Sequence, residues 1–176
     1  METRTLNSII TTICAIVFLF IAHSAFSQQQ PAPCSQDSSF RQFDFWIGEW
    51  EVKGHDGTVY GKNRIESILD GCVIMENWTG TGVSKGKSFN FYDRHNNQWI
   101  QRWVDNAGGN LDLYGEVKAG KAVFRGTSTS SNGKTVHNVL TIKKGAKNEV
   151  FQIWEQSQDS ISWQKVFDAV YHKVAN

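Results

Sequence analysis

The chain has 176 residues, which is the length of one domain with a short leader in front of it. Its 18 lysine and arginine residues nearly balance its 17 aspartate and glutamate residues. The resulting net charge of +1 excludes the strongly basic surface that nucleic-acid binding needs, so no nucleic-acid partner is predicted.

The first 27 residues have the pattern of a secretory signal peptide. Arg4 precedes an apolar run over residues 9–22, and Ala25 and Ser27 place small residues three and one positions before a cleavage site. The apolar run is too short to favour a membrane span. We therefore expect cleavage near Ser27 and a secreted or periplasmic protein that has no membrane span.

Two of the three cysteines remain after this cleavage. Cys14 leaves with the signal peptide, whereas Cys34 and Cys72 stay in an oxidising compartment, where paired cysteines form disulfides. A Cys34–Cys72 disulfide would stabilise the fold by roughly 2–4 kcal/mol. The alternative is that both cysteines are unpaired, buried thiols.

The segment that follows the signal peptide is predicted to be a tether. Residues 28–39 are polar and contain both prolines of the chain. Over residues 38–42 we expect a single helical turn capped by Ser38 or Ser39. The folded domain is then expected to span residues 40–176.

An unusually aromatic stretch, Phe43–Trp50, opens this domain. Its large side chains predict either a half-buried extended segment or a tight turn that closes one end of a barrel. Gly48 lacks a Cβ, so the chain can bend there or another backbone can approach closely. We expect Phe45, Trp46, Gly48 and Trp50 to form the barrel closure.

The rest of the chain alternates short strand patterns with turns. Turns recur about every 8–12 residues, and no proline interrupts the strands between them. Ten strands are predicted, over residues 50–53, 60–69, 73–78, 88–92, 98–104, 111–117, 121–129, 135–143, 149–155 and 164–173. A long meander of hairpins must close or leave a sticky edge, so we predict an all-β fold: an antiparallel up-and-down barrel of about eight to ten strands.

Several motifs resemble those of one protein family. Gly48-Glu49-Trp50 in a first strand is similar to the signature of lipocalins and the wider calycin group, in which the tryptophan usually lies under an arginine from a late strand. The order and spacing of further motifs resemble secreted bacterial calycin-like domains of unknown function; these motifs are residues 43–50, 63–66, 70–72, 76–80, 88–90, 101–105 and 152–157. This resemblance implies a lipocalin-like barrel and no assigned activity. Lys173 stands where such domains often have the closing arginine, and lysine lacks the planar stacking surface of arginine.

Polar residues and tryptophans repeat with period two on three of the predicted strands. Each repeat places a polar side chain and an indole on the same strand face, and we predict that these faces line a ligand-binding lumen. The predicted ligand-binding residues are Glu76, Trp78, Asn90, Gln101, Trp103, Asp105, Gln152 and Trp154. The alternative is a filled barrel in which the same residues only hold the strands together.

Other chemistry finds less support in the sequence. No glycine-rich phosphate loop or nucleophile elbow is present, and no histidines have metal-ligand spacing, so no cofactor is predicted. His137 and His172 lie on predicted strands and are the candidate haem ligands of an alternative interpretation. Glu76 and Asp105 are the carboxylates that an enzyme would use, and a protein-interaction module is a third alternative. The predicted function is non-covalent binding or carriage of a small apolar or amphipathic molecule.

Overall fold

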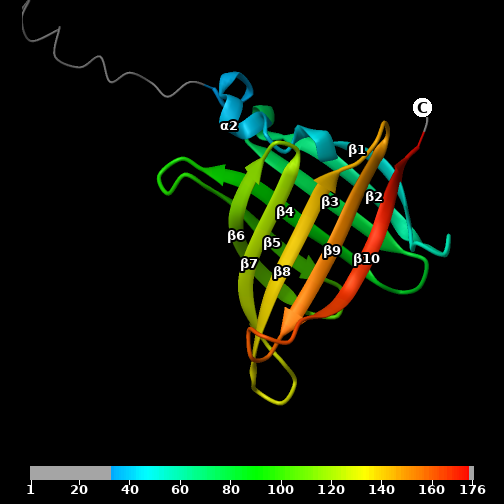
Figure 1. Ribbon diagram of the computed structural model, residues 1–176. Helices are drawn as coiled ribbons and strands as arrows, with labels where there is room; N and C mark the ends of the chain where they lie inside the picture. The colour runs from blue at the N-terminus through cyan, green and yellow to red at the C-terminus, as the bar shows by residue number, and fades with distance from the viewer. Residues whose placement is uncertain (1–32, 175–176) are drawn as a thin grey trace, which may run out of the picture. The chain divides into compact units, whose positions relative to one another are not determined.

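The computed structural model describes residues 33–174, which form a closed antiparallel β-barrel of ten strands (Figure 1). The predicted signal peptide and residues 28–32 of the predicted tether lie outside the described residues. The strands are β1 (Gly48–Lys53), β2 (Val59–Ile68), β3 (Val73–Gly80), β4 (Lys85–Asp93), β5 (Gln98–Asp105), β6 (Asn110–Lys118), β7 (Lys121–Thr129), β8 (Thr135–Lys144), β9 (Glu149–Ser157) and β10 (Gln164–Lys173). Each strand pairs with the next in the chain, and β1 pairs with β10, so the up-and-down barrel predicted from the sequence is confirmed.

Burial alternates along the strands, as expected when one face of a sheet packs inward. In β8, Val136, Asn138, Leu140 and Ile142 are buried and alternate with more exposed residues. The closing seam is short: Trp50 faces Lys173 across β1 and β10, and Val52 faces Tyr171. Trp50, Val52 and Tyr171 belong to the hydrophobic core of the barrel, whereas Lys173 is exposed.

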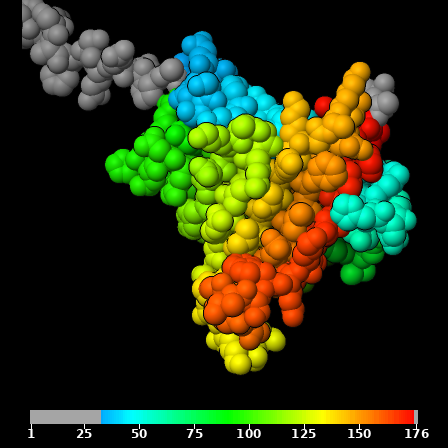
Figure 2. Space-filling view, in the orientation of Figure 1, coloured from blue at the N-terminus to red at the C-terminus, as the bar shows by residue number. Residues whose placement is uncertain are grey.

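One end of the barrel is plugged by the N-terminal segment, which contains η1 (Cys34–Gln36), α2 (Ser38–Arg41) and η2 (Asp44–Trp46). Phe43 and Trp46 are fully buried there and stack with ring centroids 5.0 Å apart. Phe43 also contacts the rings of Trp99 and Phe124, at centroid distances of 5.6 and 5.9 Å. The first part of the segment Phe43–Trp50 is therefore a tight turn that closes one end, as the second of the two conformations considered from the sequence has it, whereas Gly48 to Trp50 begin β1. In Figure 2 this segment covers one end, opposite the β7–β8 and β9–β10 loops.

Gly48 and Trp50 interact with the last strand. The indole nitrogen of Trp50 donates a hydrogen bond to the carbonyl of Trp46 at 2.8 Å, which fastens the plug to β1. The ammonium group of Lys173 lies 5.5 Å from the ring centroid of Trp50. Gly48 has a φ of 146°, and a Cβ at this position would lie 2.8 Å from Cε of Lys173. Lysine thus occupies the place above Trp50, and the missing side chain of Gly48 leaves room for it.

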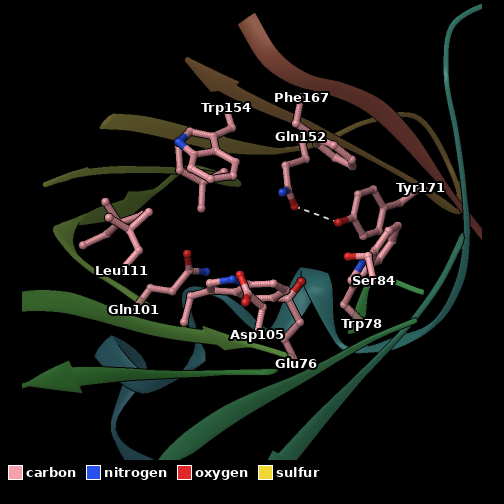
Figure 3. Close-up of a pocket in the computed structure, with 13 residues that line it drawn as sticks. Glu76, Trp78, Ser84, Gln101, Asp105, Leu111, Gln152, Trp154, Phe167 and Tyr171 are labelled. Atoms are coloured by element: carbon pink, nitrogen blue, oxygen red, sulfur yellow. Dashed lines mark hydrogen bonds between the residues drawn. The ribbon is translucent and has the colours of Figure 1, made fainter. Parts of the chain in front are cut away.

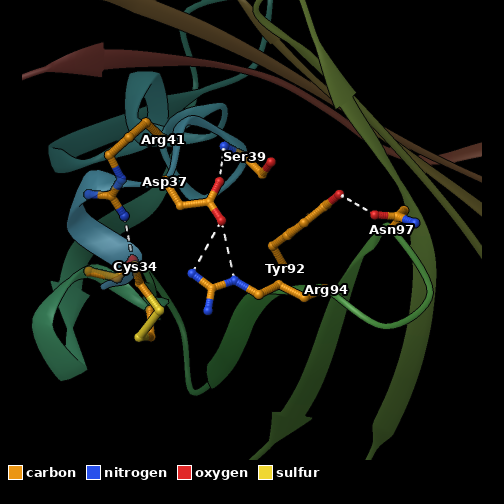
Figure 4. A network of polar contacts seen from close by, with 9 residues as sticks. Cys34, Asp37, Ser39, Arg41, Tyr92, Arg94 and Asn97 are labelled. Atoms are coloured by element: carbon orange, nitrogen blue, oxygen red, sulfur yellow. Dashed lines mark hydrogen bonds and ion pairs between the residues drawn. A yellow bond between two sulfur atoms is a disulfide. The ribbon is translucent and has the colours of Figure 1, made fainter. Parts of the chain in front are cut away.

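A disulfide joins Cys34 to Cys72, as predicted, and attaches η1 to η3 (Leu69–Gly71), the short helix between β2 and β3 (Figure 4). The residue that caps α2 is Asp37, because its carboxylate accepts from the backbone N–H of Ser39 at 2.9 Å. The predicted serine caps are therefore wrong. A carboxylate one residue earlier takes their role, and it also pairs with Arg94 at 3.2 Å.

Candidate functional site

A cavity of about 290 Å³ lies inside the barrel (Figure 3). It is at the lower end of the range for small-molecule sites, which is roughly 300–1,000 Å³. Strands β3, β5, β6, β8, β9 and β10 contribute most of its wall. The lining residues are Glu76, Trp78, Ser84, Gln101, Trp103, Asp105, Leu111, Leu113, Leu140, Gln152, Trp154, Phe167 and Tyr171.

The cavity lies between the plug and the opposite end of the barrel. Its inner part is bounded by Tyr171 of β10, which contacts Trp46 of the plug. Its outer part reaches Ser84, in the β3–β4 loop, and Asp105, the last residue of β5. In Figure 3, Trp154 and Gln152 face Gln101 and Asp105 across the empty centre.

The structure brings together nearly all of the residues that the sequence analysis selected for a lumen. Every one of the eight lines the cavity except Asn90, which is buried in the wall behind it. Their role in binding a ligand stays a prediction. The period-two pattern found them because alternate residues of a strand point to the same side of the sheet.

Glycines explain how bulky indoles leave a hollow centre. A Cβ at Gly61 would lie 2.8 Å from the ring of Trp78, and a Cβ at Gly86 would overlap the ring of Trp103. Both rings therefore lie over glycines of neighbouring strands, close against the barrel wall. Trp154 is held differently, because its indole nitrogen donates to Oδ1 of Asn138 at 2.9 Å.

A chain of hydrogen bonds runs through the inner part of the cavity wall. The hydroxyl of Tyr171 donates to Oε1 of Gln152 at 2.8 Å. Nδ2 of Asn63 lies 3.3 Å from this hydroxyl and donates to Oε1 of Glu76 at 2.7 Å. These contacts tie β9, β10, β2 and β3 together, and they hold buried polar groups that would be costly to leave unpaired.

The same chain continues across β4 to β5. The hydroxyl of Ser88 donates to Oε2 of Glu76 at 2.7 Å and accepts from Nδ2 of Asn90 at 2.9 Å. Oδ1 of Asn90 accepts from Nε2 of Gln101 at 2.8 Å. Both carboxylate oxygens of Glu76 therefore have partners in the barrel wall.

Two buried groups in this chain of hydrogen bonds have raised pKa values. Burial raises the pKa of Glu76, and the hydrogen bonds from Ser88 and Asn63 oppose the shift only in part. Burial also raises the pKa of Tyr171 well above its ordinary value, and the nearby charge of Glu76 adds to this effect. Glu76 thus holds its proton to higher pH than an ordinary glutamate, and Tyr171 stays a hydrogen-bond donor.

The pKa of Asp105 is shifted in the opposite direction, downward. Backbone N–H groups of Gly109 and Ala107 donate to Oδ1, at 2.8 and 2.9 Å, and hold the pKa of Asp105 below its ordinary value. Because this pKa is lowered, Asp105 is ionised at neutral pH and places a fixed negative charge at the outer part of the cavity.

The candidate haem ligands do not line the cavity. His137 is partly exposed between the inward residues Val136 and Asn138 of β8, and Nδ1 of His172 lies 3.6 Å from Glu149 at the surface. Within residues 33–174, no three histidine, cysteine or acidic side chains gather as metal ligands would. The arrangement therefore offers no support for a haem or metal site in this lumen.

Sequence reasoning missed several lining residues. Leu111 and Leu113 alternate as any core strand does, so their pattern does not distinguish a cavity wall from a packed core. The register between β10 and β9 shifts just before Phe167. Alternation counted from the start of β10 therefore assigns Phe167 to the wrong face, and only alternation counted back from Tyr171 places it inward. Ser84 lies in a loop, where no periodicity identifies it.

Comparisons with known proteins add no family. No protein-family model matches the chain, and a search of curated proteins finds none that is similar to it. The ten-stranded barrel is compatible with a calycin-like fold, and the family resemblance seen in the motifs stays a prediction. No helix in the described part of the chain is both long and apolar enough to traverse a bilayer.

Proposed function

We propose that the protein, after export, binds a small apolar or amphipathic molecule non-covalently in the barrel lumen. The observation that supports this proposal best is an aromatic-walled cavity of about 290 Å³, lined by three tryptophans and a small set of polar groups. Ligand sites commonly combine apolar walls with a few placed polar groups. The Cys34–Cys72 disulfide is consistent with export, because disulfides persist in oxidising compartments.

Binding accounts for this cavity better than acid–base catalysis does. A general acid must present its proton to the substrate. Both oxygens of Glu76 already bond to Asn63 and Ser88, and Oδ1 of Asp105 bonds to backbone N–H groups of its own turn. These contacts hold the two carboxylates as parts of the wall.

Titration with N-phenyl-1-naphthylamine, an uncharged apolar fluorophore, tests lumenal binding. We expect its emission to rise on saturable binding, with energy transfer from the protein's tryptophans. Trp154→Ala should weaken its affinity roughly tenfold, because a stacking wall of the cavity is lost.

Phe89→Ala is the matched control, since Phe89 is an exposed aromatic residue on the outer face of β4. Its affinity should equal that of the wild-type protein. Absence of saturable binding, or equal losses in both variants, would show that the lumen does not hold the probe.

A further inference from the structure

The lumen has an uneven charge, although the whole chain is almost neutral. Two carboxylic acids, Glu76 and Asp105, line the cavity, and no lysine, arginine or histidine does so among the described residues. The net charge of the chain is +1. Because burial raises the pKa of Glu76, the established negative charge of the lumen is that of Asp105.

The hydrogen-bond chain determines which atom of Gln101 faces the cavity. Nδ2 of Asn90 donates to the backbone carbonyl of Ile74 at 3.1 Å, so Oδ1 is the acceptor end of that amide. Oδ1 of Asn90 accepts from Nε2 of Gln101, so Gln101 must direct its own oxygen the other way. Figure 3 shows this oxygen pointing into the empty centre.

This oxygen lacks a protein partner within residues 33–174, although Gln101 is only 3% exposed. Because the oxygen faces the cavity, a guest that donates a hydrogen bond would take the place of water there. Asp105 lies on the same face of β5, two residues from Trp103 and four from Gln101, and adds a full negative charge.

The aromatic walls suit a positive group as well. Trp78, Trp103 and Trp154 surround the cavity together with Phe167. The face of an indole attracts a cation, and this attraction is strongest where water is excluded. An anion would meet the same faces unfavourably and would also be repelled by Asp105.

We propose that the guest carries a protonated amine on a small apolar body, and that this amine lies against the indoles near the carboxylate of Asp105, while Oε1 of Gln101 offers a further acceptor to the guest along the same face of β5. This inference deepens the proposed function and rests on it. It assigns the ligand to one class, the amphipathic organic cations, and excludes fatty acids and other anionic amphiphiles.

Three probes of matched size test the charge preference: 4-phenylbutylamine, 4-phenylbutan-1-ol and 4-phenylbutanoate. Isothermal titration calorimetry at neutral pH should give an affinity for the amine roughly tenfold higher than for the alcohol. The carboxylate should bind more weakly than both. Equal affinities for amine and alcohol, or the strongest binding by the carboxylate, would overturn the inference and leave lumenal binding intact.

Two variants that each remove one negative charge locate the effect. Asp105→Asn keeps an oxygen for the N–H groups of Ala107 and Gly109, so we expect the fold to persist and the amine to lose its advantage over the alcohol. Asp112 lies on the outer face of β6, opposite Arg102, so Asp112→Asn should leave both affinities unchanged. If Asp105→Asn weakens amine and alcohol equally, or if both variants behave alike, Asp105 does not hold the cation.

Failure of the inference is distinguishable from failure of the proposed function. If N-phenyl-1-naphthylamine binds and none of the three phenylbutyl probes does, a small guest still enters the lumen, and the assigned ligand class is wrong. If the fluorophore and all three probes fail, both proposals are wrong.

Discussion

Glu76 is a buried acid that has no cationic partner among residues 33–174. It is 5% exposed, and its two oxygens accept hydrogen bonds from the neutral groups Asn63 and Ser88. Neutral donors stabilise the ionised form only in part, so burial decides the direction in which its pKa moves. The ionisation of Glu76 in the lumen wall therefore makes the stability of the fold depend on pH.

We expect Glu76→Gln to stabilise the protein at neutral and alkaline pH. Because the pKa of Glu76 is raised above its ordinary value of 4.5 in the folded protein, the folded state loses relative stability as the pH rises from that value to the folded pKa. Glutamine keeps the shape and cannot ionise. Urea unfolding should give similar free energies for variant and wild type at about pH 4, and a more stable variant at about pH 8.

Asp159 provides a comparison, because its pKa is lowered whereas that of Glu76 is raised. Backbone N–H groups of Ser162 and Ile161 hold the pKa of its exposed carboxylate far below the ordinary value. Asp159→Ala should therefore be less stable than wild type at neutral pH, with a deficit that shrinks on acidification. A Glu76→Gln protein less stable than wild type at about pH 8 would contradict our account of the buried acid.

At the scale of elements, β3, β4 and β5 show how a barrel with large side chains stays hollow. Gly86 of β4 pairs with Trp78 of β3 and with Asp105 of β5, and the ring of Trp103 lies over it. Because Gly86 has no side chain, the indole of Trp103 on the next strand can lie flat against the backbone of β4. The volume of the lumen depends on such pairs of glycine and tryptophan.

Gly86→Ala should therefore both destabilise the barrel and reduce the lumen. The new methyl group would overlap the ring of Trp103 and displace it toward the centre, at a cost of about 1–3 kcal/mol. Urea unfolding measures the cost, and fluorophore titration should show weaker binding. In a Trp103→Ala background the same substitution should cost less, because the clash is gone.

Gly82→Ala is the matched control, since a Cβ at position 82 would have no neighbour within 4 Å. It should leave both stability and probe affinity close to wild type. Equal effects of the two alanine substitutions would mean that the space above Gly86 does not determine the lumen.

At the scale of the whole molecule, one covalent link connects the plug segment to the barrel. The disulfide bridges 38 positions of sequence, from Cys34 in η1 to Cys72, which lies between η3 and β3. Phe43 and Trp46, which fill the closed end, lie within the loop that it closes. The plug is therefore constrained in the unfolded chain as well as packed in the folded one.

Removing this link should lower the free energy of unfolding by roughly 2–4 kcal/mol, mainly because the unfolded chain gains freedom. Urea unfolding of Cys34→Ser/Cys72→Ser measures this loss. Wild-type protein under reducing conditions is the control and should show a similar loss. An unchanged midpoint in both samples would show that the disulfide adds nothing to stability.

The strands and the closure of the barrel could be predicted from the sequence because half-buried sheets impose a period of two on residue type. Residues 121–129 and 164–173 were predicted with the bounds that the structure has. The start of β4 was missed, because Lys85 and Gly86 have neither a β-branched nor an aromatic side chain, and cross-strand pairing holds them in the sheet.

The lumen was only partly predictable. Indoles repeated beside polar residues indicated which faces turn inward. The partners of Glu76 could not be found in this way, because Asn63 and Ser88 meet it only through the register of three strands. Whether the interior is hollow depends on ring orientation over Gly61 and Gly86, and residue alternation contains no such information.

The aromatic plug also determines from which end of the barrel a guest could enter the lumen. With Phe43 and Trp46 filling one end, the barrel resembles a cup, and nothing that enters it can pass through. A guest would therefore enter and leave away from the plug, on the side of the cavity that Asp105 and Ser84 line. Under the proposed function, a lumen closed at one end suits capture and release of a guest, whereas transport through the barrel would need two open ends.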